Sequence, residues 1–198
     1  VGRFLRANGI NTTILDNDSD RVDLLRKMGF KVFYGDATRI DILKSAGAEN
    51  AKVLVAAIDS PEINMDLVRK TREYFPNLSI MVRARNRIDA YELIDAGVND
   101  IYRESLETSV RIGVDVLVKL GFRRYSATRA GQNFIKYDEA ALSKLAAHRH
   151  DQDSYIFYTR EQIAIQEELL ANDREVNPTL HDHAWDRNSQ DTKSSSLT

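Results

Sequence analysis

Residues 12 to 20 read Thr-Thr-Ile-Leu-Asp-Asn-Asp-Ser-Asp, and this stretch decides the predicted fold. A short β-branched and apolar run ends in acidic residues, and an amphipathic helical pattern begins at once. In a doubly wound α/β sheet, this order puts Asp16 at the carboxyl end of a strand, where a carboxylate can accept both hydroxyls of a ribose. The glycine-rich turn that should lie about 20 residues earlier is missing.

The rest of the first 120 residues repeats this strand-then-helix order. Strands are predicted at 10–15, 31–34, 52–57, 78–82 and 100–102, and each is followed by a helical pattern. This rhythm is typical of βαβ units and therefore predicts an α/β fold with a doubly wound parallel sheet. The run 52–57 is nearly continuous apolar, which is typical of a strand buried on both faces.

The rhythm changes after Gly121. Helices are predicted at 125–147, where residues 136–138 could interrupt the pattern, and at 155–171. We therefore expect a nucleotide-binding domain at 1–121, a helical arm for dimer or subunit contacts at 122–186, and a disordered polar tail at 187–198.

Composition narrows the class of protein. The net charge of −2 and the pI near 6.1 give no electrostatic reason to expect nucleic acid as a partner. The sequence has no cysteine, which excludes disulfides and thiolate metal sites. No apolar run approaches the roughly 18 residues of a membrane span. The chain opens on residues that look like the middle of a helix, so we expect a fragment of something longer.

Asp16 has a plain alternative role as the cap of the following helix. Asp18 or Ser19 is better placed for that task, which favours the ribose interpretation of Asp16. The spacing of the acidic residues also imitates the start of a calcium loop. That interpretation is rejected because Arg21 stands where the loop needs glycine and Lys27 stands where it needs glutamate.

Gly35-Asp36-Ala37-Thr38 follows the second predicted strand. The glycine permits a sharp turn, Ala37 leaves room for an adenine ring, and Asp36 can accept the exocyclic amino group of the base. The alternative is a turn with a helix cap at Asp36 or Thr38.

Arg83 and Arg85 lie just past the end of a third strand, on the same side of the predicted sheet. Either side chain could neutralise a phosphate, and a solvent-facing pair of arginines is the equal alternative. The predicted nucleotide site thus comprises Asp16, Asp18, Asp36, Ala37, Thr38, Arg83 and Arg85.

The sequence does not predict an enzyme or a metal site. The histidines occur as the pairs His148 and His150 and His181 and His183, and spacing of two in polar segments is poor for zinc. No nucleophile, base and orienting group can be assembled from the spacing.

Four motifs together resemble a known family. They are Ile-Leu-Asp-x-Asp at 14–18, Lys-Val-Phe-Tyr-Gly-Asp-Ala-Thr-Arg at 31–39, Ala-Ala-Ile-Asp at 56–59 and Arg-Ala-Arg at 83–85. They are similar to the carboxy-terminal regulatory (RCK or KTN) domain of Kef-type glutathione-regulated potassium/proton antiporters. The resemblance runs from residue 1 to about residue 185.

The resemblance implies a Rossmann-like regulatory dimer that binds NAD(H) or AMP without hydride chemistry. It also implies that glutathione binds between protomers and inhibits transport, and that a glutathione conjugate relieves this inhibition. The matching ligand positions are Arg3, Arg103, Asp138 and Met28. Asp138 stands where the family has asparagine, so it can accept but not donate. Met28 stands where the family has the phenylalanine that bulky conjugates displace, so steric discrimination is expected to be softer.

The resemblance further implies what the chain belongs to. The first strand, its glycine-rich turn and a membrane antiporter domain would precede it, placing it at the cytoplasmic face of the bacterial inner membrane. The implied partners are a second copy and a flavin-dependent quinone-reductase-like ancillary subunit. Two alternatives stay open: a regulator of a Trk/Ktr-type uptake system or channel, and the nucleotide-binding fragment of an NAD-dependent dehydrogenase.

Overall fold

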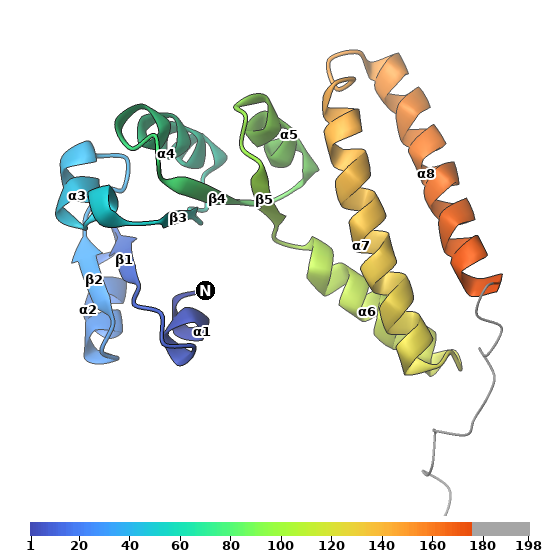
Figure 1. Ribbon diagram of the computed structural model, residues 1–198, viewed down its shortest axis with the longest axis horizontal. Coiled ribbons are helices and arrows are strands. Elements are labelled where there is room, and N and C mark those ends of the chain that lie inside the picture. The colour runs from blue at the N-terminus through green and yellow to red at the C-terminus, as the bar shows by residue number, and fades with distance from the viewer. Residues whose placement is uncertain (176–198) are drawn as a thin grey trace, which may run out of the picture. The chain divides into compact units, whose positions relative to one another are not determined.

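The computed structural model describes residues 1–175, which fall into two compact units (Figure 1). The first unit covers residues 1–104, and the second begins at Ser105. The boundary predicted at residue 121 lies one helix further along the chain. The predicted tail at 187–198 lies outside the described residues, and so do His181 and His183.

The first unit alternates strands and helices along its whole length. Its elements are α1 (Gly2–Ala7), β1 (Thr13–Asp16), α2 (Ser19–Lys27), β2 (Lys31–Tyr34), α3 (Ile40–Ser45), the 3₁₀ turn η1 (Ala48–Asn50), β3 (Val53–Ala56), α4 (Pro61–Tyr74), β4 (Ser79–Ala84), α5 (Arg87–Asp95) and β5 (Asp100–Arg103). Every strand predicted from the sequence is present, with ends shifted by a few residues.

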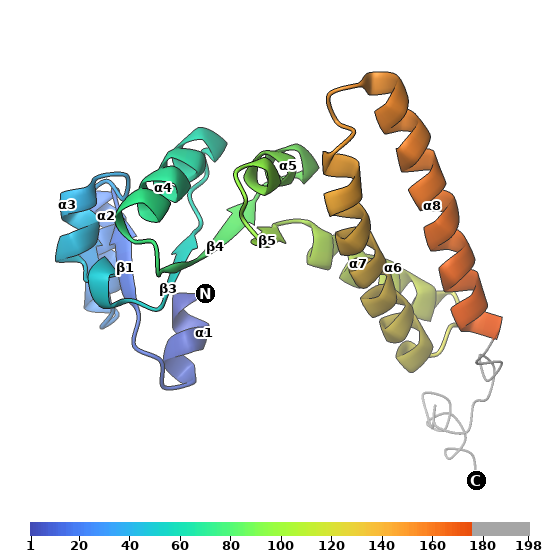
Figure 2. The ribbon, with the colours of Figure 1, turned by 45° about the horizontal axis from the view of Figure 1, so that its top comes forward.

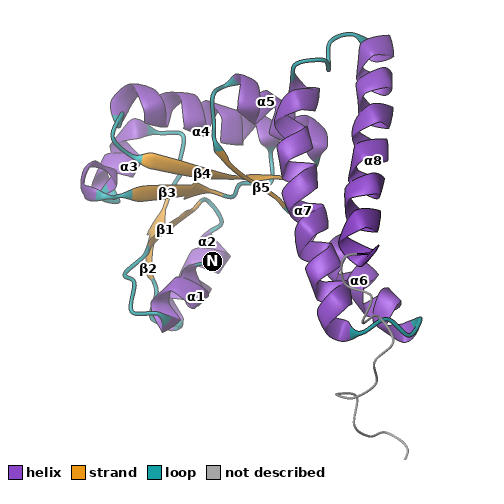
Figure 3. Ribbon diagram, turned by 45° about the vertical axis from the view of Figure 1, so that its right-hand side comes forward, coloured by secondary structure: helices purple, strands orange, loops and turns teal. Residues whose placement is uncertain are grey.

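The strands form two parallel sheets (Figure 3). One sheet pairs β1 with β2, and the other has the order β3-β4-β5. Within residues 1–104, β1 pairs with β2 alone and β3 with β4 alone, so each sheet has an edge at β1 or β3. The prediction of a parallel α/β fold is confirmed.

Caps and apolar faces explain where the helices of this unit form. Side-chain oxygens of Asp18, Ser60 and Asn86 accept a backbone N–H from the first turns of α2, α4 and α5 respectively. Helix α2 packs on β1 and β2, whereas α4 and α5 pack on the three-stranded sheet. The fully buried side chains include Val22, Leu43, Val68 and Val82.

Strand β3 corrects one expectation. Its apolar run predicts burial on both faces, but Val53 and Val55 are 46% and 41% exposed, while Ala56 is buried. Helix α4 covers the face that carries Ala56. Among the described residues, β3 is therefore covered on one face only, and Val53 and Val55 are exposed.

The second unit consists of helices α6 (Leu106–Lys119), α7 (Arg124–Ala146) and α8 (Gln152–Glu175). Helix α6 packs on α7, and α7 packs on α8 (Figure 2). Helix α7 is continuous through residues 136–138, so the predicted interruption is wrong; Asp138 is buried on that helix and does not break it. Leu142 and Leu145 are among its buried side chains.

No helix among the described residues is long and apolar enough to cross a membrane.

Candidate functional site

Asp16 is the last residue of β1 and lies at the carboxyl end of that strand, as predicted. Its side chain is 15% exposed; one oxygen accepts from the backbone N–H of Asp18 at 3.0 Å, and the other accepts from Arg21 Nη1 at 3.2 Å. Asp18 is the residue that caps α2, through a 3.0 Å bond from the Arg21 backbone N–H. Asp16 is therefore not the helix cap, and one of its oxygens faces an exposed, replaceable arginine.

The turn after β2 lies directly beside Asp16. Residues Asp16 and Tyr34 are paired in the sheet, and the Gly35 N–H donates to the Asp16 carbonyl at 3.0 Å. Gly35 has a φ of +154°, and a Cβ there would come within 3.1 Å of Ile42. Glycine is thus required for the turn that carries Asp36 to the same sheet edge.

Asp36 and Thr38 form a local turn motif. One oxygen of Asp36 accepts from both the backbone N–H and the hydroxyl of Thr38, each at 2.8 Å. These two bonds hold the pKa of Asp36 below its ordinary value of 3.8, and the bond from the backbone N–H has the larger effect. The structure therefore contains the turn of the alternative interpretation, but neither Asp36 nor Thr38 caps α3, because the N-cap of that helix is Arg39 and no side chain caps it. The same turn leaves Asp36 exposed and ionised for a ligand.

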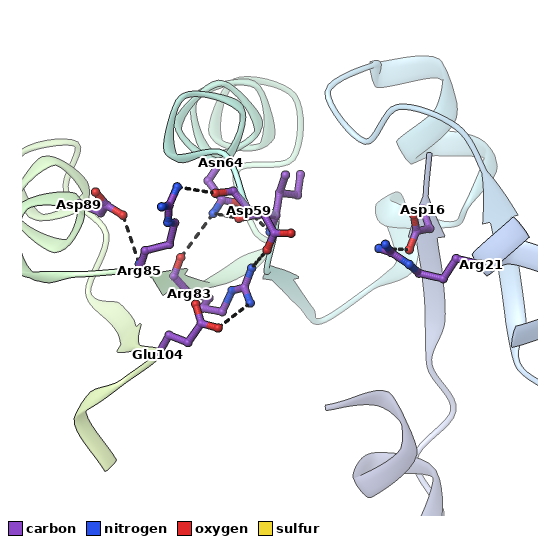
Figure 4. A network of polar contacts seen from close by, with 9 residues as sticks. Asp16, Arg21, Asp59, Asn64, Arg83, Arg85, Asp89 and Glu104 are labelled. Atoms are coloured by element: carbon purple, nitrogen blue, oxygen red, sulfur yellow. Dashed lines mark hydrogen bonds and ion pairs between the residues drawn. The ribbon is translucent and has the colours of Figure 1, made fainter. Parts of the chain in front are cut away.

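Arg83 lies inside β4 rather than past its end, and carboxylates hold it (Figure 4). It contacts Asp59 at 2.5 Å and Glu104 at 3.4 Å, and its side chain is 28% exposed. Arg83 is thus partly exposed and paired with two exposed carboxylates, which follow the ends of β3 and β5. A phosphate would have to displace one of these carboxylates.

Arg85 follows β4 and is less committed than Arg83. Its Nη1 donates weakly to the Asp59 carbonyl at 3.4 Å, and its backbone N–H donates to Asp89 at 3.2 Å. Arg85 also lines a small hollow with Pro61 and Glu92. Of the two arginines, Arg85 is the one that could reach a phosphate with the smaller loss of existing contacts.

Asn64 is a buried residue of α4 that ties the ends of β3 and β4 together. Its side chain accepts from the Ile58 N–H at 3.1 Å, donates to the Ile58 carbonyl at 2.8 Å, and reaches the Arg83 carbonyl at 3.4 Å. This clamp orients the loop that carries Asp59 (Figure 4). The polar cluster is thus held by a side chain that is 4% exposed.

Sequence reasoning missed three members of this cluster as individual residues: Asp59, Asn64 and Glu104. Asp59 and Glu104 follow the ends of β3 and β5, so the rule that ligands gather at carboxyl ends of parallel strands could have found them. Asn64 gave no such signal, because a single polar residue in a helix is expected to lie at the protein surface.

The structure divides the predicted nucleotide residues between the two sheets. Asp16 and Asp36 belong to the β1-β2 sheet, and Arg83 and Arg85 to the β3-β4-β5 sheet.

The predicted glutathione residues are also distributed over several elements. Arg3 is exposed on α1, Met28 is 55% exposed at the end of α2, and Arg103 is the last residue of β5. Asp138 is 7% exposed on α7 and belongs to the second unit. Their assembly into one site stays a prediction.

No group of three or more metal-ligating acidic or histidine side chains occurs within the part of the chain that the structure describes.

Comparison with protein families divides the chain near the boundary between the two units. Residues 1–104 match the TrkA-N domain, and residues 108–189 match the potassium efflux system KefB C-terminal domain. Among curated proteins, the glutathione-regulated potassium-efflux system protein KefC of Escherichia fergusonii is 37% identical over 186 residues. That alignment covers 93% of this chain and 30% of the relative, as does the one with KefC of Escherichia coli.

Two solved structures are similar to the chain. The Kef carboxy-terminal domain of Shewanella denitrificans, solved in an AMP-bound form, is 40% identical with a TM-score of 0.68, over 74% of this chain and 89% of that one. The TrkA-N domain of the inner membrane protein ybaL of Escherichia coli is 26% identical with a TM-score of 0.53, over 59% and 85%.

The fold is therefore of the Rossmann-like α/β class. The chain belongs to the TrkA-N family, in the form that makes up the carboxy-terminal regulatory domain of Kef-type potassium efflux systems. These are families of regulatory domains, not of catalytic enzymes. The chain spans about a third of the length of the curated relatives that it matches.

Proposed function

We propose that this chain is the ligand-sensing domain of a bacterial glutathione-gated potassium/proton antiporter. It would bind AMP or NAD(H), together with glutathione or its conjugates, to control potassium efflux. The observation that carries this proposal is that the likeness to KefC extends over 93% of the chain, helices of the second unit included. A match to the KefB C-terminal domain supports the antiporter over a Trk/Ktr-type regulator or a dehydrogenase fragment.

The nucleotide would lie at the carboxyl ends of β1 and β2. Asp16 accepts the ribose hydroxyls there, and Asp36 accepts the amino group of the adenine beside Ala37. Ribose hydroxyls would compete with Arg21 for Asp16, and this exchange costs little because the arginine is 60% exposed. The AMP-bound Shewanella relative supports a nucleotide of this class. The nucleotide has a regulatory role, and the domain performs no hydride transfer.

Glutathione is the proposed effector, held by Arg3, Arg103, Asp138 and Met28. Two arginines suit a tripeptide with two carboxylates, because each guanidinium can form a bidentate pair. The effector acts by population shift: it changes transport to the extent that it binds one arrangement of the domains better than the other.

The same family membership supports a proposal for the assembly. The chain would act as a homodimer, attached to a membrane antiporter domain of the same polypeptide and lying at the cytoplasmic face of the inner membrane. A flavin-dependent quinone-reductase-like subunit is the proposed ancillary partner.

Replacing Asp16 tests the nucleotide seat. We expect Asp16→Ala to weaken AMP binding in calorimetry by roughly 1.5–3 kcal/mol, because a charged acceptor for the ribose is lost. Asp20→Ala is the matched control, since Asp20 is exposed on the first turn of α2. Equal AMP affinity in both variants would contradict the assignment.

Replacing Arg103 tests the effector site. We expect Arg103→Ala to weaken glutathione binding by roughly 1.5–3 kcal/mol, the range for hydrogen bonds to charged groups. Arg69→Ala, which removes an exposed arginine of α4, should leave the affinity unchanged. The proposal would not survive calorimetry of the intact polypeptide in which glutathione fails to bind at all.

A further inference from the structure

Arg21 contacts the carboxylate that is proposed to hold the ribose (Figure 4). Its Nη1 lies 3.2 Å from Asp16 Oδ2, and its Nη2 lies 3.5 Å from Asp18 Oδ2. The other oxygen of Asp16 accepts from the Asp18 backbone N–H. A ribose hydroxyl that bonds to Asp16 Oδ2 would therefore lie next to the guanidinium of Arg21.

The preferences of helix α2 do not favour an arginine at this position. Asp18 is the N-cap, so Arg21 is the third residue of the helix. A capping box has glutamate or glutamine there, and the helix dipole disfavours a positive charge in the first turn. The guanidinium instead contacts the carboxylates of Asp16 and Asp18 at the strand end. Its position thus fits the chemistry of the ribose site better than that of the helix.

The ion pair between Arg21 and Asp16 opens at low cost. The Arg21 side chain is 60% exposed, and an ion pair at such a position contributes little to stability. The guanidinium has five N–H donors in a planar fork that matches the oxygens of a phosphate. The side chain can therefore yield Asp16 to a hydroxyl and bind a phosphate on the same ribose.

Dinucleotide-binding folds recognise the ribose in two ways: a carboxylate accepts the 2′-hydroxyl, or an arginine binds a 2′-phosphate. This chain has both groups in contact. We propose that Arg21 extends the ligands of the nucleotide seat to adenine nucleotides with a 2′-phosphate, the group by which NADP(H) differs from NAD(H). This inference rests on the proposed function, in which Asp16 holds the ribose. The carboxylates of Asp16 and Asp18 repel a 2′-phosphate, so its binding depends on Arg21.

Arg21 and Asp16 should shift one affinity ratio in opposite directions. Adenosine 2′,5′-bisphosphate differs from AMP only by the 2′-phosphate, so the ratio of the two affinities reports on that position alone. Removing Arg21 frees Asp16 for the hydroxyls and leaves a 2′-phosphate facing carboxylates only. Removing the charge of Asp16 has the reverse effect on the ratio. A merely structural role of Arg21 would instead change both affinities by the same factor.

The experiment is calorimetry of both nucleotides with the intact polypeptide. We expect the unmodified protein to bind the bisphosphate about 10-fold more weakly than AMP, because two carboxylates oppose the added charge. In Arg21→Leu, AMP affinity should rise by up to about 5-fold, since an exposed ion pair no longer competes for Asp16. Bisphosphate affinity should fall by about 10- to 100-fold, the effect of losing hydrogen bonds to a charged group.

Three further variants complete the series. Arg21→Lys keeps the charge without the planar fork and should give an intermediate ratio. Asp16→Asn should lower the affinity for AMP more than that for the bisphosphate. Lys27→Leu removes the same charge from the exposed far end of α2, so it is the matched control and should change neither affinity.

The two ligands separate this inference from the proposed function. Failure of AMP to bind the unmodified protein overturns the nucleotide seat, and this inference with it. Binding of AMP without measurable binding of the bisphosphate overturns the inference alone, and so does an unchanged affinity ratio in Arg21→Leu. Where Arg21→Leu does not fold, Arg21→Lys decides: the inference then requires a loss of bisphosphate affinity relative to that for AMP.

Discussion

At the scale of single residues, the strand-end acids do two tasks at once. Asp36 shapes its own turn through Thr38 and still presents a charged group at the sheet edge. Asp16 similarly fixes the backbone at Asp18 while facing Arg21. Shaping a local turn and binding a ligand are therefore compatible roles for these carboxylates, since each carboxylate has two oxygens and several lone pairs.

The pKa of Asp36 provides a test at this scale. We expect Asp36 to titrate below 3.8, and Thr38→Val to raise its pKa by removing the hydroxyl donor; Thr38→Ser should leave it low. Because the folded pKa is depressed, the stabilisation is fully present above the unfolded value and is lost as pH falls through the folded pKa. NMR titration of the side-chain carboxyl measures this directly. An identical pKa in Thr38→Val would contradict the role of the hydroxyl.

At the scale of elements, the contact between α6 and α7 depends on one glycine. A Cβ on Gly131 would lie 2.7 Å from Val114 Cγ2 and 3.0 Å from Val110 Cγ1, whereas Gly113 on α6 has open space around it. Valine side chains are stiff at χ1 and cannot easily move away. The two helices therefore pack as closely as they do because Gly131 has no side chain.

These two glycines form a matched pair for measurement. Gly113→Ala should stabilise the protein by up to about 1 kcal/mol, the helix-propensity gain. Gly131→Ala has the same gain but should be less stable than Gly113→Ala by roughly 1–3 kcal/mol, the cost of overpacking. Urea unfolding of both variants gives the difference. Equal free energies of unfolding would show that the helices separate without cost.

At the scale of the whole molecule, two sheet edges stand out. Within residues 1–104, β1 and β3 are each paired on one side, and β3 also exposes Val53 and Val55. Unpaired, apolar edge strands are templates for pairing with other chains. We expect the 198-residue chain to associate beyond a dimer as its concentration rises.

A charged residue at this edge should suppress the association. Val55→Lys should reduce the higher-order species, because a charge on an edge strand disfavours pairing. Tyr74→Lys, at a 51% exposed position of α4, is the control and should have no such effect. Sedimentation velocity over a concentration series is the measurement. A monomer–dimer distribution that is the same in all three proteins would contradict this prediction.

The order of the elements and the strand-end positions of Asp16 and Asp36 could be predicted from the amino-acid sequence alone. Alternating patterns and caps are local, so they can be read along the chain. The similarity to Kef-type domains was likewise visible in short motifs around these strand ends. The Phe-Tyr-Gly-Asp-Ala segment combined a strand, a required glycine and an acid in a few residues.

Which side chains meet across elements could be seen only in the three-dimensional structure. The pairing of Arg83 with Asp59 and Glu104 joins the ends of three strands, and Arg6 reaches Met28 across 22 positions of sequence. The division into two sheets and the open face of β3 are also tertiary, because they depend on which strands and helices lie next to one another. Long-range contacts of this kind leave no periodic signal along the chain, which is why sequence reasoning found Arg83 but not Asp59 and Glu104, the two carboxylates that it contacts.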